Sequence, residues 1–463
     1  MISNELLKKI GLYFVGNLSS KILSAILLPI FAFNVTSSDL GQFDFSQTLM
    51  AILSPIVFVA IWEAVLKFLL TEENEHLKRK LITTITLFSL SVALIFGVCF
   101  WLVISSLNEY TINYFFLVTS MIIVHSFAVI WQYYTRAFQK NKLYVLSGVI
   151  ATIVNFVLII VLVVLLKLGL LGMLIAYNLG QLSIVLITEF KLNIRSYIKL
   201  KLFDFALLKK ILTFSSPLVL NLISGWLIVG FGKVLITIKL GTEVNGLFSF
   251  SSRFALIITM FGSVVAMALI EEAIMSVKRD GLNKNFNKSI DSIFKIFQSI
   301  SLMAVPAIVL FYGFLRNTDY YESLVYAPWL LLYAIANTMA INIGSAFQAI
   351  GKTKYQFYTT FMGGIISSGI SVFLIDHIGV TAVIISCIIG ATVMMVSRYF
   401  IINKFINFTL NWKSIVYRTL FFIAITLICL NTPTYISFIL EIVIIITILY
   451  ENRGLVKKIK KIN

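Results

Sequence analysis

The sequence predicts an all-α polytopic membrane protein. Of its 463 residues, 59% are hydrophobic and only 12% are charged, whereas soluble domains carry about 25% charged residues. The mean hydropathy is +0.98. Apolar runs long enough to cross a hydrocarbon core of ~30 Å as helices recur from one end of the chain to the other. We therefore expect about 14 transmembrane helices, arranged as two six-helix lobes followed by two C-terminal helices.

Each expected span is a mostly apolar run of roughly 17–30 residues. The spans cover about residues 10–35, 41–70, 81–105, 113–138, 143–166, 169–190, 213–239, 244–271, 289–313, 322–350, 355–375, 379–403, 414–431 and 434–450. Proline residues predict bends in the first, second and seventh of these spans, at Pro29, Pro55 and Pro217, because proline removes a backbone hydrogen bond from a helix.

The basic residues fall on one side of these spans. With the N-terminus inside, 28 of the 37 lysines and arginines lie in segments predicted to be cytoplasmic, and three lie in outer loops. Cytoplasmic loops are enriched in Lys and Arg, so both termini are expected to be cytoplasmic. The net charge of +17 then reflects topology, and no nucleic-acid partner is expected. The basic segment 191–212 is either an amphipathic surface helix on anionic lipid or a solvated linker.

An internal repeat relates the two predicted lobes. Three stretches match in order: Gly41–Ser46 with Gly246–Ser251, Ala137–Gln139 with Ala346–Gln348, and Leu168–Leu182 with Ile378–Thr392. The offsets are 205, 209 and 210 residues. Because six spans separate the copies, the copies have the same orientation and form a parallel repeat about an axis along the membrane normal. The predicted domains are residues 1–200, 201–405 and 406–463, the last holding spans 13 and 14 and a basic cytoplasmic tail.

Two cations lie deep in predicted spans. Lys21 lies near the middle of the first span and Arg253 about nine residues into the eighth, so the two come from opposite lobes. A charge at the bilayer centre costs about 2.5–3.5 kcal/mol on an insertion scale. We interpret the two as cavity residues that bind a diphosphate or an acidic sugar between the lobes. The alternative is a structural pairing of each with a carboxylate or a helix-end carbonyl.

Four further ionisable residues within the spans have a functional and a structural interpretation each. Lys67 either joins the cavity cations or pairs with Glu63, four residues before it on the same helix face. Glu63 is also a candidate for a protonatable coupling group. Lys233 either binds substrate or extends to the outer surface from span 7. His125, mid-way along span 4, suits proton coupling or a hydrogen bond to a neighbouring helix. Asp44 is expected at the outer interface.

The sequence offers no chemistry for a metal site, a cofactor or a catalytic group. The three cysteines lie apart in apolar runs, and the chain holds only three histidines. No segment between the predicted spans is long enough to hold a catalytic domain. We therefore expect a transporter rather than an enzyme, without cofactor or metal.

These features together resemble a known family. The G-x-F-x-F-S stretches at Gly41–Ser46 and Gly246–Ser251 and the A-F-Q turns at Ala137–Gln139 and Ala346–Gln348, within fourteen spans, resemble the polysaccharide-transport branch of the MOP flippase superfamily. Within that branch they resemble bacterial O-antigen flippases of the Wzx type. The resemblance implies a MATE-like fold and a substrate built of an oligosaccharide on undecaprenyl diphosphate. It also implies movement of that head group to the periplasmic face by alternating access.

The resemblance places the protein in the bacterial cytoplasmic membrane. Expected partners are the lipid-linked oligosaccharide and membrane lipids, with other polysaccharide assembly proteins as further candidates, and the protein is expected to be a monomer. Three other functions make different demands on the sequence. A drug or organic-cation antiporter would favour buried acidic residues, of which Glu63 is the one candidate. An O-antigen polymerase would need a large periplasmic loop, and a structural scaffold would not need deep cations.

Overall fold

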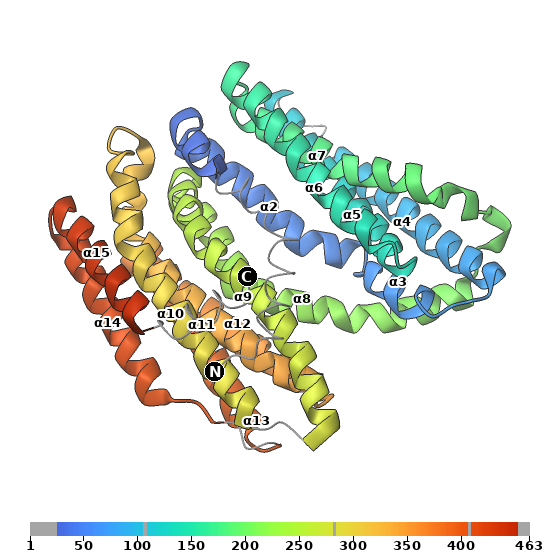
Figure 1. Ribbon diagram of the computed structural model, residues 1–463. Coiled ribbons are helices and arrows are strands. Elements are labelled where there is room, and N and C mark those ends of the chain that lie inside the picture. The colour runs from blue at the N-terminus through green and yellow to red at the C-terminus, as the bar shows by residue number, and fades with distance from the viewer. Residues whose placement is uncertain (1–25, 105–108, 281–283, 406–408, 452–463) are drawn as a thin grey trace. The chain divides into compact units, whose positions relative to one another are not determined.

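The computed structural model describes residues 26–104, 109–280, 284–405 and 409–451, and these ranges contain helices and no strands (Figure 1). The α-helices are α2 (Ser37–Val57), α3 (Trp62–Leu69), α4 (Glu75–Ile104), α5 (Glu109–Ala137), α6 (Asn141–Ile159), α7 (Gly169–Leu192), α8 (Phe205–Leu240), α9 (Thr242–Asp280), α10 (Lys284–Gly313), α11 (Ala327–Ala349), α12 (Thr353–Ile378), α13 (Val380–Ile402), α14 (Trp412–Asn431) and α15 (Thr434–Glu451). Short segments are the π-helix η1 (Ile160–Leu165) and the 3-10 helices η2 (Ile194–Tyr197), η3 (Leu200–Leu202) and η4 (Asp319–Val325).

The expected multi-span, all-helical fold is confirmed. Within the described residues, 11 helices are long and apolar enough to cross a membrane, or 12 if the bent pair α2 and α3 forms one span. Helix α15 is apolar over the shorter stretch Thr434–Ile448, and the first expected span lies mostly before residue 26. The count of fourteen crossings stays a prediction.

The chain forms two compact units. One unit is Gly16–Gly246, here the amino-terminal unit, and the other begins at Leu247, here the carboxy-terminal unit. The first turn of α9 therefore belongs to the amino-terminal unit. These two units are defined by their compactness, whereas the predicted lobes are defined by the internal repeat. The lobe boundaries therefore stay a prediction.

In the amino-terminal unit, α7 packs against α5 and α6, and α2 packs against α5, α7 and α8. The hydrophobic core of this unit lies around α3 and includes the fully buried side chains of Phe58, Ile82, Tyr134 and Ile211. In the carboxy-terminal unit, α13 packs against α11 and α12, and α10 packs against α14 and α15. Many large apolar side chains on the helix exteriors are exposed, Leu94 for example at 69%, as expected for helices that face lipid.

The second span breaks between α2 and α3, as Pro55 predicted (Figure 1). Helix α2 ends at Val57, and Val59 and Ala60 adopt the left-handed conformation with φ of 51° and 45°. The Ala60 amide donates to the Pro55 carbonyl at 2.9 Å, which closes the turn. Helix α3 then leaves at 48° to α2. By contrast, α8 continues unbroken through Pro217.

The basic segment after α7 is neither a long amphipathic helix nor a free linker. It folds as η2 and η3 against the start of α4, where the Thr83 hydroxyl donates to the Tyr197 carbonyl at 3.2 Å and accepts from the Lys199 amide at 3.1 Å. The Lys80 ammonium forms an ion pair with Asp204. Asp204 also caps α8, because its carboxylate accepts from the Leu207 amide at 3.0 Å. This cap starts a new helix at Phe205 and divides the segment.

Positions matched by the repeat share backbone conformations, with one shift. Gly169 and Gly379 both have positive φ, 52° and 57°, where α7 and α13 begin. After α5, Gln139 takes φ of 57°, and after α11 the residue in this role is Gly351 with φ of 68°. The A-F-Q match had placed Gln348 opposite Gln139. The equivalent turn instead lies at Gly351, three residues after Gln348, because glycine adopts a positive φ without a Cβ penalty.

Candidate functional site

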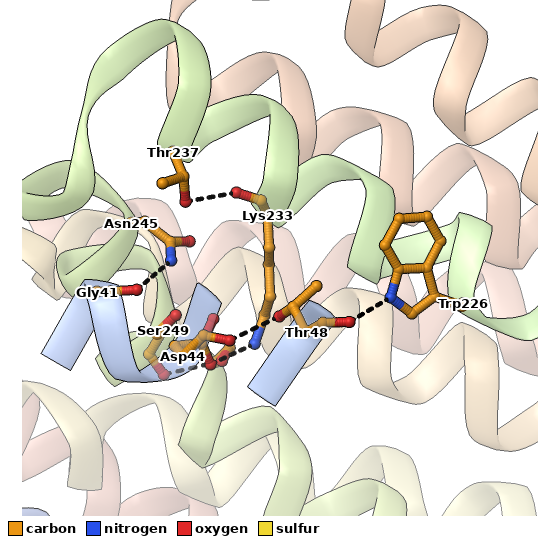
Figure 2. Close-up of polar contacts among 9 residues, drawn as sticks. Gly41, Asp44, Thr48, Trp226, Lys233, Thr237, Asn245 and Ser249 are labelled. Carbon is orange, nitrogen blue, oxygen red and sulfur yellow. Dashed lines mark hydrogen bonds and ion pairs between the residues drawn. The ribbon is translucent and has the colours of Figure 1, made fainter. Parts of the chain in front are cut away.

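An ion pair links α2 to α8 within the expected membrane region. The Lys233 ammonium lies 2.8 Å from Oδ1 of Asp44, and the two side chains are 14% and 11% exposed (Figure 2). Asp44 is seven residues from the start of α2 and Lys233 is seven residues from the end of α8. At 1.5 Å per residue, each lies about 10 Å inside its helix end. Lys233 is therefore paired with a carboxylate of a neighbouring helix. The expected position of Asp44 at the outer interface stays a prediction.

A second contact fixes the same two helices. The Trp226 indole donates to the Thr48 carbonyl at 3.0 Å, and the Thr48 hydroxyl donates to the Asp44 carbonyl at 2.8 Å (Figure 2). Trp226 and Lys233 are two turns apart on α8, so they use one face of that helix. Two points of attachment hold the helix register, and the ammonium is thereby aimed at the carboxylate.

The first turn of α9 crosses α2 at very close range. An added Cβ on Gly41 would lie 1.8 Å from the Thr242 carbonyl oxygen, and one on Gly246 would lie 1.8 Å from the Ser37 carbonyl oxygen. The contact is symmetric under the repeat, because Gly246 matches Gly41 and Thr242 matches Ser37 at the same offset. The Ser38 and Thr242 hydroxyls also share a hydrogen bond of 2.9 Å. Only glycine permits this approach.

Two buried oxygens near this crossing have no hydrogen-bond partner among the described residues. They are Oδ2 of Asp44 and Oδ1 of Asn245. The Asn245 amide donates through Nδ2 to the Gly41 carbonyl at 2.9 Å, which fixes the side chain (Figure 2). Asp44 is 8% exposed as a residue, and Asn245 is fully buried. Unpaired buried acceptors are costly, so these two atoms mark a site with capacity for a donor or a cation.

On α3, which lies near the start of α8, the expected ion pair of Glu63 with Lys67 is not formed. Glu63 accepts a hydrogen bond of 2.8 Å from the Tyr133 hydroxyl. The Lys67 side chain is exposed, and its ammonium lies 5.5 Å from the centre of the Phe214 ring. Phe214 and Lys233 are 19 residues apart on one continuous helix, which corresponds to about 28 Å. Lys67 and Lys233 therefore cannot contact one phosphate together in this arrangement.

His125 lies among α5, α7 and α2. Its Nδ1 is 3.2 Å from the Tyr177 hydroxyl, and Gln181 is within hydrogen-bonding reach of the ring. The Tyr177 hydroxyl also donates to the Met50 sulfur at 3.4 Å. The histidine is thus hydrogen-bonded to a neighbouring helix, and nothing in these contacts tests its expected part in coupling.

Of the two deepest predicted cations, only Arg253 lies within the described residues. Lys21 lies outside the described residues. Arg253 lies on α9 in the carboxy-terminal unit, half-buried, next to the packed rings of Phe250 and Phe254. These two residues keep their predicted role as a proposal.

Sequence reasoning missed one buried cation. Arg398 on α13 is one of the 28 basic residues expected in cytoplasmic segments, at the end of the span 379–403, but it is only 2% exposed. Its guanidinium donates to the Ala340 carbonyl at 2.5 Å, to the Thr359 hydroxyl at 3.1 Å and to the Thr360 hydroxyl at 2.8 Å. It ties α11 and α12 to α13. Arg398 lies near the end of an apolar run, where a basic residue is expected to reach the cytoplasmic surface. No local sequence pattern indicates that it is buried.

The α2, α8 and α9 segments that form the Asp44–Lys233 site lie within a region recognised at the level of sequence. A family model for polysaccharide biosynthesis proteins matches residues 6–270, which is more than half of the chain. The chain belongs to this polysaccharide biosynthesis protein family. No curated protein matches the sequence of this family member.

Solved structures show the fold of this polysaccharide biosynthesis protein. The lipid II flippase MurJ in an inward closed conformation matches with a TM-score of 0.67 at 15% identity, covering 96% of this chain and 99% of that chain. A multidrug resistance MATE family transporter of the MOP superfamily, inward-facing, matches with a TM-score of 0.65 at 16% identity, covering 85% and 94%. A MOP superfamily transporter from Pyrococcus furiosus matches with a TM-score of 0.56 at 14% identity, covering 86% and 95%. The fold is that of MOP superfamily transporters, and the chain is a multi-pass membrane protein.

Proposed function

We propose that this protein is a flippase that moves an undecaprenyl-diphosphate-linked oligosaccharide, an O-antigen or similar repeat unit, from the cytoplasmic to the periplasmic face by alternating access. The family match and the likeness to a lipid II flippase support a lipid-linked saccharide as the substrate class. The single observation that carries the proposal is Lys233, a cation held well inside an apolar helix against one carboxylate. Such intramembrane charges mark substrate pathways.

The cations are proposed to serve the diphosphate in sequence. Lys67 would attract it at the cytoplasmic mouth and Lys233 would bind it toward the periplasmic side, about one hydrocarbon thickness away along α8. Lys21 and Arg253 are proposed to bind it in the central cavity. Glu63 and His125 remain candidates for ion coupling. Both termini are proposed to lie in the cytoplasm of a bacterial cell, which the positive-inside charge distribution supports.

The proposed partners are the lipid-linked substrate and the membrane lipids around it. Other polysaccharide assembly proteins are proposed to supply and consume that substrate, since glycan transfer precedes and polymerisation follows its movement. The protein is proposed to act as a monomer and not as an enzyme.

The alternative is a cation-coupled antiporter of drugs or organic cations. The MATE likeness favours it on fold, and Glu63 and Asp44 supply carboxylates within the membrane region. The charge balance opposes it, because Asp44 is already paired with a lysine and organic cations would meet Lys233 there.

Transport by the purified full-length protein in vesicles separates the two. Vesicles are loaded with a short-chain polyprenyl-diphosphate-linked N-acetylglucosamine, and a membrane-impermeant galactosyltransferase with a radiolabelled donor detects the sugar at the outer face. We expect faster labelling with the protein than in protein-free vesicles. Transport of ethidium under an imposed gradient, with no effect on labelling, would overturn the flippase proposal in favour of the antiporter.

A further inference from the structure

We propose that Asp44 is an exchangeable counter-ion for Lys233, which a substrate phosphate displaces and which then takes up one proton. The inference deepens the proposed function and rests on it for the class of anion. The exchange makes Asp44 a residue that links anion binding to a proton, beside the expected coupling candidates Glu63 and His125.

The geometry shows why the two anions would compete. The Lys233 ammonium has one carboxylate at 2.8 Å, and both side chains are nearly nine-tenths buried. A lysine ammonium is a point charge with three rotatable donors, and it can turn from one oxygen to another without a large movement. A phosphate oxygen would form the same charge-assisted contact as Oδ1 of Asp44.

The displaced carboxylate must then be neutralised. An ionised carboxylate left buried without its partner carries a large desolvation penalty, and it binds a proton instead. Oδ2 of Asp44 is buried and accepts no hydrogen bond from any described residue, so it is open to protonation. The step balances: one proton from water on the open side forms an O–H bond on Asp44, while the ammonium keeps its charge and pairs with the phosphate.

The surroundings leave Lys233 as the one charged group shown to contact Asp44. Two tyrosines on the elements packed against α2 contact that helix at other residues: Tyr114 of α5 at Ser46, at 2.9 Å, and Tyr177 of α7 at Met50. His125 of α5 contacts Tyr177, and the second lysine near this end of α8, Lys239, lies six residues after Lys233. On the first turn of α9, Glu243 is exposed, whereas Asn245 presents an uncharged amide. The second unpaired acceptor, Oδ1 of Asn245, offers a neutral partner to a protonated carboxyl.

Proton uptake on binding tests the exchange. The probe is geranyl-diphosphate-linked N-acetylglucosamine, a diester whose phosphates do not titrate near neutral pH, added to purified protein in weakly buffered detergent with a pH indicator. We expect wild type to take up about one proton per probe bound and its affinity to fall about tenfold per pH unit on the alkaline side. Asp44→Asn should take up none, bind at least about tenfold more tightly and lose the pH dependence.

Controls keep the outcomes separate. Asp39→Asn, five residues before Asp44 on α2, should behave as wild type. If Asp44→Asn fails to fold, the double variant Asp44→Asn with Lys233→Gln replaces two charges by neutral groups of similar size; it should fold, take up no proton and bind the probe weakly. Unchanged proton uptake in either Asp44 variant overturns the inference. So does binding that depends on Na⁺ at fixed pH without proton uptake, whereas a wild type that binds no probe overturns the proposed function itself.

Discussion

Arg398 on α13 donates to the backbone carbonyl of Ala340 on α11 at 2.5 Å, and it also donates to the neutral hydroxyl oxygens of Thr359 and Thr360. Among the described residues, no carboxylate forms an ion pair with it. The guanidinium is 2% exposed, so several neutral acceptors must replace its water. The fork of five donors, rather than the charge alone, makes this possible.

Arg398→Lys should therefore destabilise the protein although the charge is kept. A lysine has three donors at one point and would leave some of these acceptors unpaired, at a cost of about 2–4 kcal/mol. Thermal unfolding followed by size-exclusion chromatography in detergent measures the effect. Lys404→Gln, an exposed position two residues after α13, is the control and should not change the midpoint. An unchanged midpoint for Arg398→Lys would show that the hydrogen-bond fork is not needed.

Gly41→Ala and Gly246→Ala should each disturb the crossing of α2 with the first turn of α9. A Cβ at 1.8 Å from a carbonyl oxygen forces the backbones apart, so we expect a loss of more than about 2 kcal/mol in stability. Gly225→Ala on α8 is the matched control, because no atom lies within 4 Å of its added Cβ. In a helix interior that change should stabilise by about 0.5–1 kcal/mol. Equal midpoints for all three variants would contradict the close approach.

Lys21→Ala and Arg253→Ala should each abolish glycan export while the protein remains inserted in the membrane. Removal of a cavity cation takes away a charge-assisted contact to the diphosphate, which is worth about 1.5–3 kcal/mol for each hydrogen bond. Surface polysaccharide in the native host is the readout, with membrane abundance measured alongside. Lys413→Ala, near the start of α14, should export normally. Normal surface glycan in both cavity variants would remove these residues from the substrate path.

The linker after α7 should loosen in acid. The ion pair with Lys80, followed by the amide hydrogen bond from Leu207, lowers the pKa of Asp204 below its usual 3.8. The contribution of this contact to docking is present above the usual pKa and is lost as the pH falls through the lower folded value. Asp204→Ala should imitate that loss at neutral pH.

Tryptic cleavage at Lys199 and Lys201 measures the docking of this linker. Both side chains are exposed, and the backbone between them is held against α4 in the intact protein. Cleavage should be several-fold faster in Asp204→Ala, because the lost cap also frees the first turn of α8. Glu73→Ala, exposed after α3, is the control. Equal cleavage rates would mean that the threonine contacts alone hold the linker.

The sequence predicts the helices well because the bilayer imposes a simple length rule on apolar runs. The bend after Pro55 also follows from local chemistry. The partner of Lys233 does not: helix rise gives its depth, but the facing carboxylate lies 189 residues away. Arg398 was misplaced for a related reason, since burial near a helix end depends on which neighbours surround it. Contacts that join distant segments need the packing, which hydropathy does not encode.

The turn at Val59 and Ala60 has an energetic consequence for the second span. A β-branched residue and an alanine in the left-handed region each cost about 1–3 kcal/mol relative to their preferred backbone conformations. The buried side chains of Phe58 and Ile61 offset that cost only while they stay in the core. The bend between α2 and α3 is therefore strained. In any state in which the side chains of Phe58 and Ile61 leave the core, straightening this segment would lower the free energy.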